Sequence, residues 1–323
     1  MKSKYEEVQN AVARLARDGV KGVILDMRGN PGGILDQSIA MSNLFLKDGQ
    51  EIVSVRGRTT EPQRFTTSGN AVFPTVPLTV LTDDGSASAS EIVAGALQDH
   101  DRALVVGGTS FGKGLVQTLF PLDGGYALKI TTAKWYTPSG RSIQRERKFE
   151  NGKFVETQPD SLETEAKKKS RPAYRSDAGR IVYGGGGITP DEKIPSEKLN
   201  IFQRRMGPQE GPNWFYRFAN NYFGGAKPSL QLGWQADDAV VERFHKFLNE
   251  HKRNVTFTDE EFAENKKWIA GQIRWEFYFR AFDRAAAERA KWTDDPQVLK
   301  AIESLPKAQN LLSQAQKVFA MRQ

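Results

Sequence analysis

The stretch Pro77-Leu-Thr-Val-Leu-Thr-Asp-Asp-Gly-Ser-Ala-Ser-Ala-Ser-Glu-Ile-Val-Ala-Gly95 joins an apolar run to a turn of small polar residues and then to a helical pattern. Residues 77–82 predict a buried strand and residues 88–98 predict a helix. A strand that runs directly into a helix places the turn between them at the carboxyl end of a sheet. The stretch therefore predicts an α/β fold with Ser86, Ser88 and Ser90 at that end.

The same alternation of strands and helices continues on both sides of this stretch. Further elements are expected at residues 5–18 (helix), 23–27 (strand), 35–46 (helix), 52–58 (extended), 103–106, 115–122 and 126–136 (strands). This order predicts an α/β layer fold with parallel pairing that becomes β-rich after residue 114. Beyond residue 198 the sequence turns into aromatic-rich helical segments. We expect two domains, 1–198 and 199–323, with an exposed charged insertion at about 141–180.

Composition and charge exclude several classes of function. The 323 residues include no cysteine, which excludes disulfides, thiolate metal sites and cysteine catalysis. No window approaches the 18 or so apolar residues of a membrane span. The net charge of +7 is modest, and the basic runs at 145–148 and 167–171 contain no aromatic residues for base stacking. These runs predict solvated loops and no nucleic-acid partner.

The serine turn has a structural and a catalytic interpretation. Ser88-Ala-Ser-Glu91 fits the S-x-x-E capping box, in which the serine and the glutamate satisfy the first N–H groups of a helix. The same turn would expose a nucleophile beside the positive end of the helix dipole, with an oxyanion donor in the next N–H. It contains no base, so the base must come from elsewhere in the chain.

The chain has three histidines, and none is a good candidate for that base. His245 and His251 lie in the helical tail, where packing roles are expected. His100 is twelve residues beyond Ser88, which is roughly 18 Å along a helix. A histidine triad is therefore not expected.

Lys113 is the more unusual residue, because Phe111-Gly-Lys-Gly114 flanks it with glycines and no acid lies between Asp101 and Asp123. A lysine acts as a base only when it is neutral, which requires burial to lower a pKa that is ordinarily about 10.4. The apolar neighbours predict such burial, and Gln117 could orient the amine without charging it. An exposed loop lysine is the alternative.

Two glycine-rich segments also need an interpretation. Gly107-Gly-Thr-Ser-Phe-Gly-Lys113 satisfies the G-x-x-x-x-G-K part of a phosphate-binding loop, but Gly114 replaces the metal-binding Ser or Thr and the next segment predicts a strand. No nucleotide is therefore expected. Arg28-Gly-Asn-Pro-Gly-Gly33 predicts a turn whose unobstructed N–H groups could approach an oxyanion.

Together, Asp26-Met-Arg-Gly-Asn-Pro-Gly-Gly33, Gly85-Ser-Ala-Ser-Ala-Ser-Glu91, Phe111-Gly-Lys-Gly114 with Gln117, Tyr136-Thr-Pro-Ser-Gly-Arg-Ser-Ile143 and Gly184-Gly-Gly-Gly-Ile-Thr-Pro-Asp191 resemble the C-terminal processing (tail-specific) peptidases. The resemblance implies a crotonase-like α/β core without metal, nucleotide or other cofactor. It implies a serine endopeptidase that cleaves polypeptides near their C-terminus. In the family pattern Ser88 is the nucleophile, Lys113 the base and Gln117 the third member. The oxyanion would be bound by the backbone N–H groups of Ala89 and Gly33.

The family normally carries, before the Asp26 strand, a targeting segment, an N-terminal helical part and a PDZ domain, none of which is found in this sequence. An upstream signal would imply a periplasmic, extracytoplasmic or membrane-associated location. We expect the helical segment after residue 199 to buttress the core or to form a homo-oligomer. A catalytically silent fragment or scaffold that binds peptides or a partner is the alternative function. A crotonase-like acyl-thioester enzyme is a third, although it leaves Ser88, Lys113 and Gln117 unexplained.

Overall fold

The computed structural model describes residues 4–321 except residues 59, 70, 146, 151–152, 157–164 and 209. The chain divides into two compact units. Unit 1 comprises Met1–Ser196 together with Lys300–Gln323, and unit 2 comprises Glu197–Leu299. The first boundary lies close to the expected one at residue 198. The last residues, however, group with unit 1 and not with the helical unit.

A parallel sheet forms the centre of unit 1. It contains β1 (Val23–Asp26), β4 (Leu78–Thr82), β5 (Leu104–Gly107) and β12 (Glu192–Lys193) in the order β1-β4-β5-β12. Every neighbouring pair is parallel, as the alternation of strands and helices predicts. All five residues of β4 are buried, so this strand lies in the core. The carboxyl end of β4 leads directly into the serine turn.

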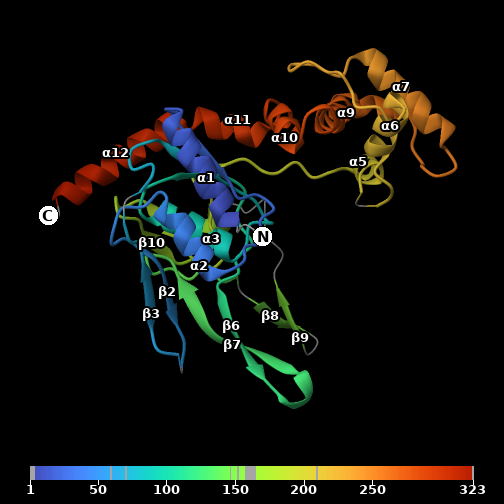
Figure 1. Cartoon of the computed structure of the whole chain (residues 1–323). Helices are drawn as coiled ribbons and strands as arrows, with labels where there is room; N and C mark the ends of the chain where they lie inside the picture. The colour runs from blue at the N-terminus through green and yellow to red at the C-terminus, as the bar shows by residue number, and fades with distance from the viewer. Residues whose placement is uncertain are drawn as a thin grey trace. The chain divides into compact units, whose positions relative to one another are not determined.

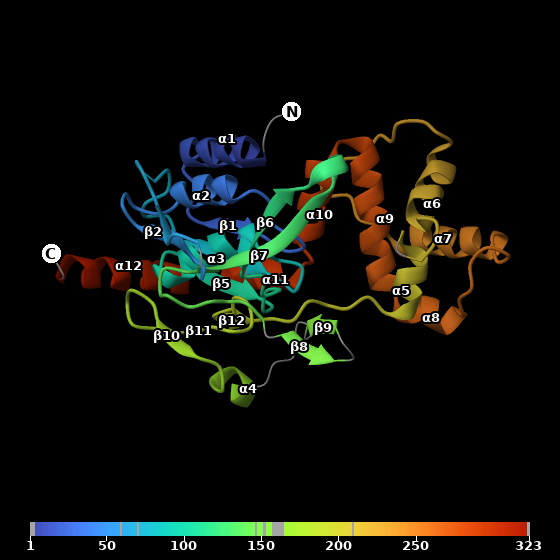
Figure 2. The same cartoon turned by 90° about the horizontal axis from the view of Figure 1, so that it is seen from below.

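Four helices belong to unit 1 beside this sheet: α1 (Lys4–Arg17), α2 (Leu35–Asn43), α3 (Ala89–Asp99) and α12 (Leu305–Met321). In Figure 2, α1 and α2 lie side by side, and α12 lies apart from them next to β5. Helix α12 contacts β4 and β5, and its apolar residues Leu311 and Leu312 are only 6% and 5% exposed. Its burial against the sheet is the physical reason why it belongs to unit 1.

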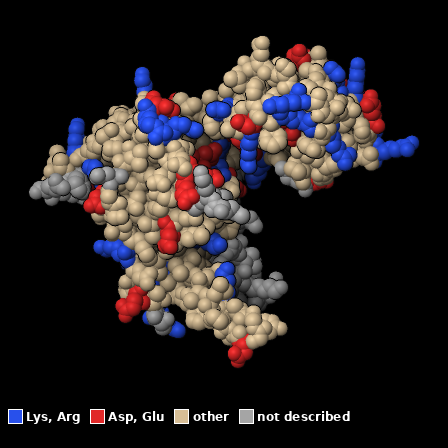
Figure 3. All heavy atoms as spheres, viewed as in Figure 1, with Lys and Arg blue, Asp and Glu red and all other residues tan. Residues whose placement is uncertain are grey.

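A second, antiparallel sheet contains β3 (Gln63–Thr66), β2 (Glu51–Arg56), β7 (Ala127–Tyr136) and β6 (Leu115–Pro121), in the order β3-β2-β7-β6. The short turn η1 (Asp123–Gly125) joins β6 to β7. Figure 1 shows that this hairpin projects well beyond the rest of unit 1. Its outer half exposes apolar side chains, among them Leu119 and Tyr126. The hairpin, at the bottom of Figure 3, accordingly shows mostly uncharged atoms.

The remaining part of unit 1 contains β8 (Arg147–Glu150), β9 (Lys153–Glu156), α4 (Glu165–Lys169), β10 (Ala173–Arg175) and β11 (Ile181–Tyr183). The prediction of an exposed insertion at about 141–180 is wrong at its beginning. Arg141 and Ile143 are completely buried, and the Arg141 guanidinium forms an ion pair with Asp99 at 2.7 Å. Pairing with a buried carboxylate is what allows an arginine to be placed in the core. Residues 157–164 of the expected insertion lie outside the described residues.

Unit 2 is helical and has its own aromatic core. Its helices are α5 (Ile201–Met206), α6 (Trp214–Phe223), α7 (Asp238–Glu250), α8 (Asp259–Glu264), α9 (Lys266–Ala281) and α10 (Arg284–Trp292), and α11 (Pro296–Glu303) contains the second boundary. Phe215 and Phe244 stack with ring centroids 4.9 Å apart. A capping box formed by Thr258 and Glu261 begins α8. None of the described helices is long and apolar enough to cross a membrane.

Candidate active site

Ser88 occupies a strained turn between β4 and α3. Its φ of 55° and ψ of −115° are rare for a residue with a side chain, and only one other non-glycine residue among those described has a positive φ. Such a conformation costs on the order of 1–3 kcal/mol and persists only where surrounding contacts enforce it. The turn leaves the serine half-buried at the N-terminus of α3, at the carboxyl edge of the parallel sheet.

Ser86 and Ser90 make structural hydrogen bonds. The Ser86 hydroxyl donates to the Met27 carbonyl at 2.8 Å, and the Ser90 hydroxyl donates to the Asn30 carbonyl at 2.9 Å. The Asn30 carbonyl also accepts the Ala87 N–H at 3.0 Å. These bonds bring the turn after β1 against the serine turn, although the two are more than fifty residues apart in sequence.

The closest approach of the two turns is made by Gly32. A Cβ on Gly32 would overlap the Ala87 carbonyl oxygen and lie 2.7 Å from the Ala89 nitrogen, and its φ is +86°. Only glycine fits such a position. The sequence pattern pointed to Gly33 and did not reveal this role of Gly32. Gly33 itself has open space around its Cα and an ordinary φ.

Two backbone N–H groups in these two turns, those of Ala89 and Gly33, have no hydrogen-bond acceptor among the described residues. Ala89 is the first residue of α3, where N–H groups have no acceptor within the helix. The neighbouring Gly32 N–H, by contrast, donates to the Asn30 side chain at 3.0 Å. Unpaired donors at a half-buried turn can bind a negatively charged oxygen.

Glu91 is the residue that connects the serine turn to the lysine loop. Its side chain is completely buried and accepts four hydrogen bonds. Oε2 accepts the N–H groups of Ser88 at 2.8 Å and Lys113 at 2.9 Å. Oε1 accepts the Ser110 hydroxyl at 2.5 Å and the Gly112 N–H at 2.7 Å. The capping-box pattern predicted only the first of these bonds, because the others come from a distant segment.

Burial raises the pKa of Glu91 above its ordinary value, although the hydrogen bonds from Ser110, Lys113, Gly112 and Ser88 act in the opposite direction. Four donors around two oxygens match the accepting capacity of a carboxylate. The group therefore acts as a fixed anchor for the main chain on both sides of the site.

Lys113 and Gln117 are both exposed, so the predicted burial of Lys113 is wrong for this structure. The apolar neighbours Phe111 and Val116 are partly buried, but they do not cover the lysine. Lys113 lies just before β6, and β6 is an edge strand that has a neighbour on one side only. No hydrogen bond between Lys113 Nζ and Ser88 Oγ is found among the described residues.

The glycines on either side of Lys113 are explained by close packing of the main chain. A Cβ on Gly112 would lie 3.1 Å from the Gly187 nitrogen, and one on Gly114 would lie 3.0 Å from the Gln144 nitrogen. The Arg145 N–H donates to the Gly112 carbonyl at 2.9 Å. The lysine loop is thus held against residues 144–145 and 187, and its backbone is fixed even though the side chain is exposed.

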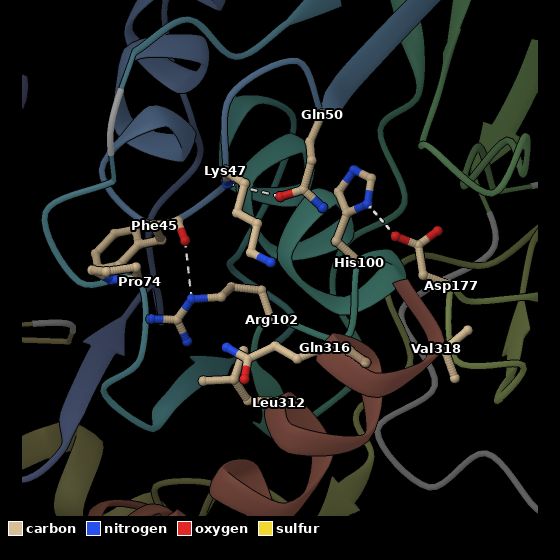
Figure 4. A pocket seen from close by; sticks show the side chains of 11 residues that line it. Phe45, Lys47, Gln50, Pro74, His100, Arg102, Asp177, Leu312, Gln316 and Val318 are labelled. Atoms are coloured by element: carbon tan, nitrogen blue, oxygen red, sulfur yellow. Dashed lines mark hydrogen bonds and ion pairs between the residues drawn. The ribbon is translucent and has the colours of Figure 1, made fainter. Parts of the chain in front are cut away.

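His100 cannot serve as the base, in agreement with the sequence. It follows α3, and both ring nitrogens are occupied: Nδ1 lies 2.7 Å from Asp177 Oδ2 and Nε2 lies 2.6 Å from the Glu51 carbonyl oxygen. Figure 4 shows His100 turned toward Asp177 at the edge of a cavity of about 50 Å³, which Leu312 of α12 also lines. This cavity contains none of the five predicted site residues.

The pair of His100 and Asp177 predicts a pH dependence of stability. Burial disfavours the charged ring, but the hydrogen bond and negative charge of Asp177 outweigh burial and raise the pKa of His100. A raised pKa in the folded state adds stability below the unfolded pKa of about 6.5, and this stability is lost as the pH rises through the folded pKa. Asp177→Asn should therefore lower the free energy of unfolding more at pH 6 than at pH 9. Chemical denaturation at both pH values measures this, and equal losses would contradict it.

The other two histidines make local contacts in unit 2. His245 Nε2 lies 2.9 Å from Asp259, and His251 Nδ1 lies 2.7 Å from the Phe247 carbonyl oxygen. Among the described residues, no group of three or more His, Cys, Asp or Glu side chains could hold a metal ion.

Part of the chain is similar to known proteins. Residues 1–160 match the profile of peptidase family S41. The S41 segment thus contains both turns of the site, Glu91 and the lysine loop. The resemblance to the C-terminal processing peptidases is confirmed by the relatives of this segment.

A carboxy-terminal-processing protease of Bartonella bacilliformis is 51% identical over 145 residues, which are 43% of this chain and 33% of the relative. A carboxyl-terminal-processing protease of Synechocystis sp. is 44% identical over 141 residues, which are 44% of this chain and 33% of the relative. A solved photosystem II D1 C-terminal processing protease shares 28% identity over 61% of this chain and 40% of its own, with a TM-score of 0.45. The chain thus spans about a third of the length of these curated relatives.

Proposed function

We propose that the chain is the catalytic part of a serine endopeptidase that cleaves polypeptides near their C-terminus, and that unit 1 is a crotonase-like core. Ser88 is the nucleophile and Lys113 the general base. The N–H groups of Ala89 and Gly33 form the oxyanion hole, and Gln117 orients the lysine amine. The names of the relatives and the S41 match of residues 1–160 support the peptidase class.

One observation carries this proposal. Two N–H groups without a partner among the described residues, from Ala89 and Gly33, belong to the two turns that meet at a strained, half-buried serine. Preorganised donors of this kind stabilise the charge of a tetrahedral intermediate and are worth about 2.7–4 kcal/mol each in known enzymes. A turn that served only to cap a helix would not require a second turn with a free donor beside it.

The reaction follows from these groups. Ser88 Oγ attacks the carbonyl carbon of the scissile peptide bond while neutral Lys113 Nζ accepts the hydroxyl proton. The carbonyl oxygen becomes negative and is bound by the Ala89 and Gly33 N–H groups. Lys113 then returns the proton to the leaving amine as the C–N bond breaks, which leaves an acyl-enzyme. A water molecule, deprotonated by Lys113, hydrolyses the ester and restores Ser88.

The exposure of Lys113 sets a condition on this mechanism. A lysine accepts a proton only in its neutral form, which exclusion of water favours. The bound polypeptide must therefore cover the lysine and exclude water before the amine can act as a base. Gln117 lies four residues further along, on the edge strand β6, where its amide can accept or donate without introducing a charge.

The exposure of Lys113, and the lack of a hydrogen bond from it to Ser88 among the described residues, also favour a second function, that of a catalytically silent peptide-binding scaffold. A serine-directed fluorophosphonate distinguishes the two, because it reacts only where a nucleophilic serine and an oxyanion hole are assembled. We expect the label on Ser88, by peptide mapping, in the folded chain and no label in Ser88→Ala or in heat-denatured chain. A folded chain without any label at Ser88 would favour the scaffold.

A further inference from the structure

A basic groove lies on the antiparallel sheet of unit 1, at the end of β2 and along the last half of β7. It is a shallow, open groove of about 480 Å³ that is lined by residues 56–58, residues 131–134 and Tyr136. Sites that bind small molecules or short peptide segments commonly have volumes of about 300–1,000 Å³. The groove is therefore large enough to receive one or two side chains of a polypeptide.

The groove is positively charged. Arg56, Arg58 and Lys134 are exposed in it, and no Asp or Glu lines it. None of these three cations forms an ion pair with a residue that the structure describes. The Arg56 guanidinium lies over the Tyr136 ring at 4.9 Å from its centroid, which holds one cation in place without neutralising it.

The sheet register places two of these cations directly opposite each other. Arg56 of β2 is the cross-strand partner of Lys134 of β7. Like charges in such positions destabilise a sheet. Val55 and Trp135, the next pair, are buried on the other face, so the two cations share the solvent-facing side. An arrangement that costs stability and has no internal counter-charge is suited to an anionic ligand.

Gly57 shapes the groove. A Cβ on this residue would overlap the Thr132 carbonyl oxygen and lie 3.0 Å from the Ala133 Cβ. The glycine therefore lets the chain after β2 pass close to β7 and brings Arg58 to the same cavity. The groove results from main-chain packing and not only from flexible side chains that happen to be near each other.

The groove lies close to the lysine loop in the sheet. Lys134 is the cross-strand partner of Leu115, and the Trp135 indole N–H donates to the Lys113 carbonyl at 3.1 Å. One cross-strand step and two residues along the chain separate Lys134 from Lys113, which is roughly 10 Å or three residues of extended peptide. A substrate held at Ser88 could thus place a neighbouring segment in the groove.

We propose that this groove binds an acidic segment of the polypeptide substrate, a few residues from the bond that is cleaved. The ligand chemistry is that of Asp and Glu carboxylates, which arginine binds through paired hydrogen bonds. The inference rests on the proposed peptidase function for the identity of the ligand. The binding itself does not depend on peptidase turnover, because none of the proposed catalytic residues lines the groove.

The experiment measures binding without cleavage. The chain with Ser88→Ala is titrated against a fluorescently labelled peptide with three Glu residues and against the same peptide with three Gln residues. We expect Arg56→Gln/Arg58→Gln to weaken binding of the acidic peptide about tenfold, to leave the Gln peptide unchanged, and to reduce the salt dependence of acidic binding. Lys129→Gln is the matched control, because Lys129 is an exposed cation of β7 that does not line the groove.

Each other outcome overturns the proposal. No binding of the acidic peptide, equal weakening for both peptides, or equal weakening by Lys129→Gln would show that the groove does not recognise carboxylates. Tighter binding of a single-stranded oligonucleotide of equal charge, lost in the double variant, would assign the groove to nucleic acid. Failure of Ser88 labelling would reject the peptidase and leave this binding result unaffected.

Discussion

Replacing Glu91 with alanine is expected to lower the free energy of unfolding by at least about 3 kcal/mol and to slow labelling of Ser88 by about 100-fold. The variant leaves four donors without an acceptor, and each unsatisfied buried group costs about 1–3 kcal/mol. It also releases the Ser88 N–H from the contact that stabilises its strained turn. A displacement of about 1 Å at a reacting group can reduce a rate about 100-fold.

Glu91→Gln makes this prediction sharper. If the NH2 group of the glutamine took the place of Oε2, it would face the N–H groups of Ser88 and Lys113. It could not accept a hydrogen bond from either of them. If the NH2 group took the place of Oε1, it would face only one main-chain N–H, that of Gly112, together with the Ser110 hydroxyl. The glutamine should adopt the second orientation, which preserves the bond to Ser88. We therefore expect a loss of stability but faster labelling than in Glu91→Ala.

Denaturant titration and labelling kinetics measure the two effects separately. The matched control is Glu276→Gln in unit 2, a buried carboxyl whose pKa is raised by burial and which accepts the Asn213 amide at 3.0 Å. This control should leave the rate of Ser88 labelling unchanged, because Glu276 makes no contact with the serine turn. If Glu91→Ala labels at the wild-type rate, Glu91 does not position the serine.

Lys113→Ala should remove peptidase turnover with almost no change in stability. General-base catalysis contributes about 100-fold to 10,000-fold to a rate. The Lys113 side chain is exposed, and substitutions at exposed positions usually change the free energy of unfolding by less than about 0.5 kcal/mol. The measurement compares single-turnover acylation by a peptide ester with the denaturation midpoint of the same preparation.

The control for this variant is Lys129→Ala, which removes another exposed lysine from the β6–β7 hairpin. It should acylate at the wild-type rate. Full acylation by Lys113→Ala would reject the lysine as the base, whereas loss of acylation together with unfolding would assign it a structural role. Arginine at position 113 offers a further test, because it keeps the positive charge but cannot supply a free amine.

The elements of unit 1 were predictable because their signals are local. The apolar run at 77–82 and the capping residue Ser88 predict β4 and α3 to within a residue or two of their observed bounds. The strands at 115–122 and 126–136 appear as β6 and β7 for the same reason. Sequence periodicity and caps are sufficient where an element is determined by its own residues.

The exposure of Lys113 was not predictable in this way. Its sequence neighbours Phe111 and Val116 are apolar. They bury the lysine side chain only if it points toward the same side of the main chain as their own side chains. The position of β6 at the edge of its sheet depends on the pairing of four strands. The contacts of Glu91 with Ser110 and Gly112 are also long-range, so the capping box revealed only one of its four bonds.

The return of the chain to unit 1 has a consequence for biosynthesis. Leu305 begins α12, packs against Gly22, and belongs to the last 24 residues of the chain, which group with unit 1. A ribosome releases these residues only after all of unit 2 has been made. Unit 2 is therefore inserted between two segments of unit 1, and β4 and β5 are synthesised long before the helix α12 that contacts them. A stop codon after residue 198 would leave this apolar surface open to chaperones and to aggregation.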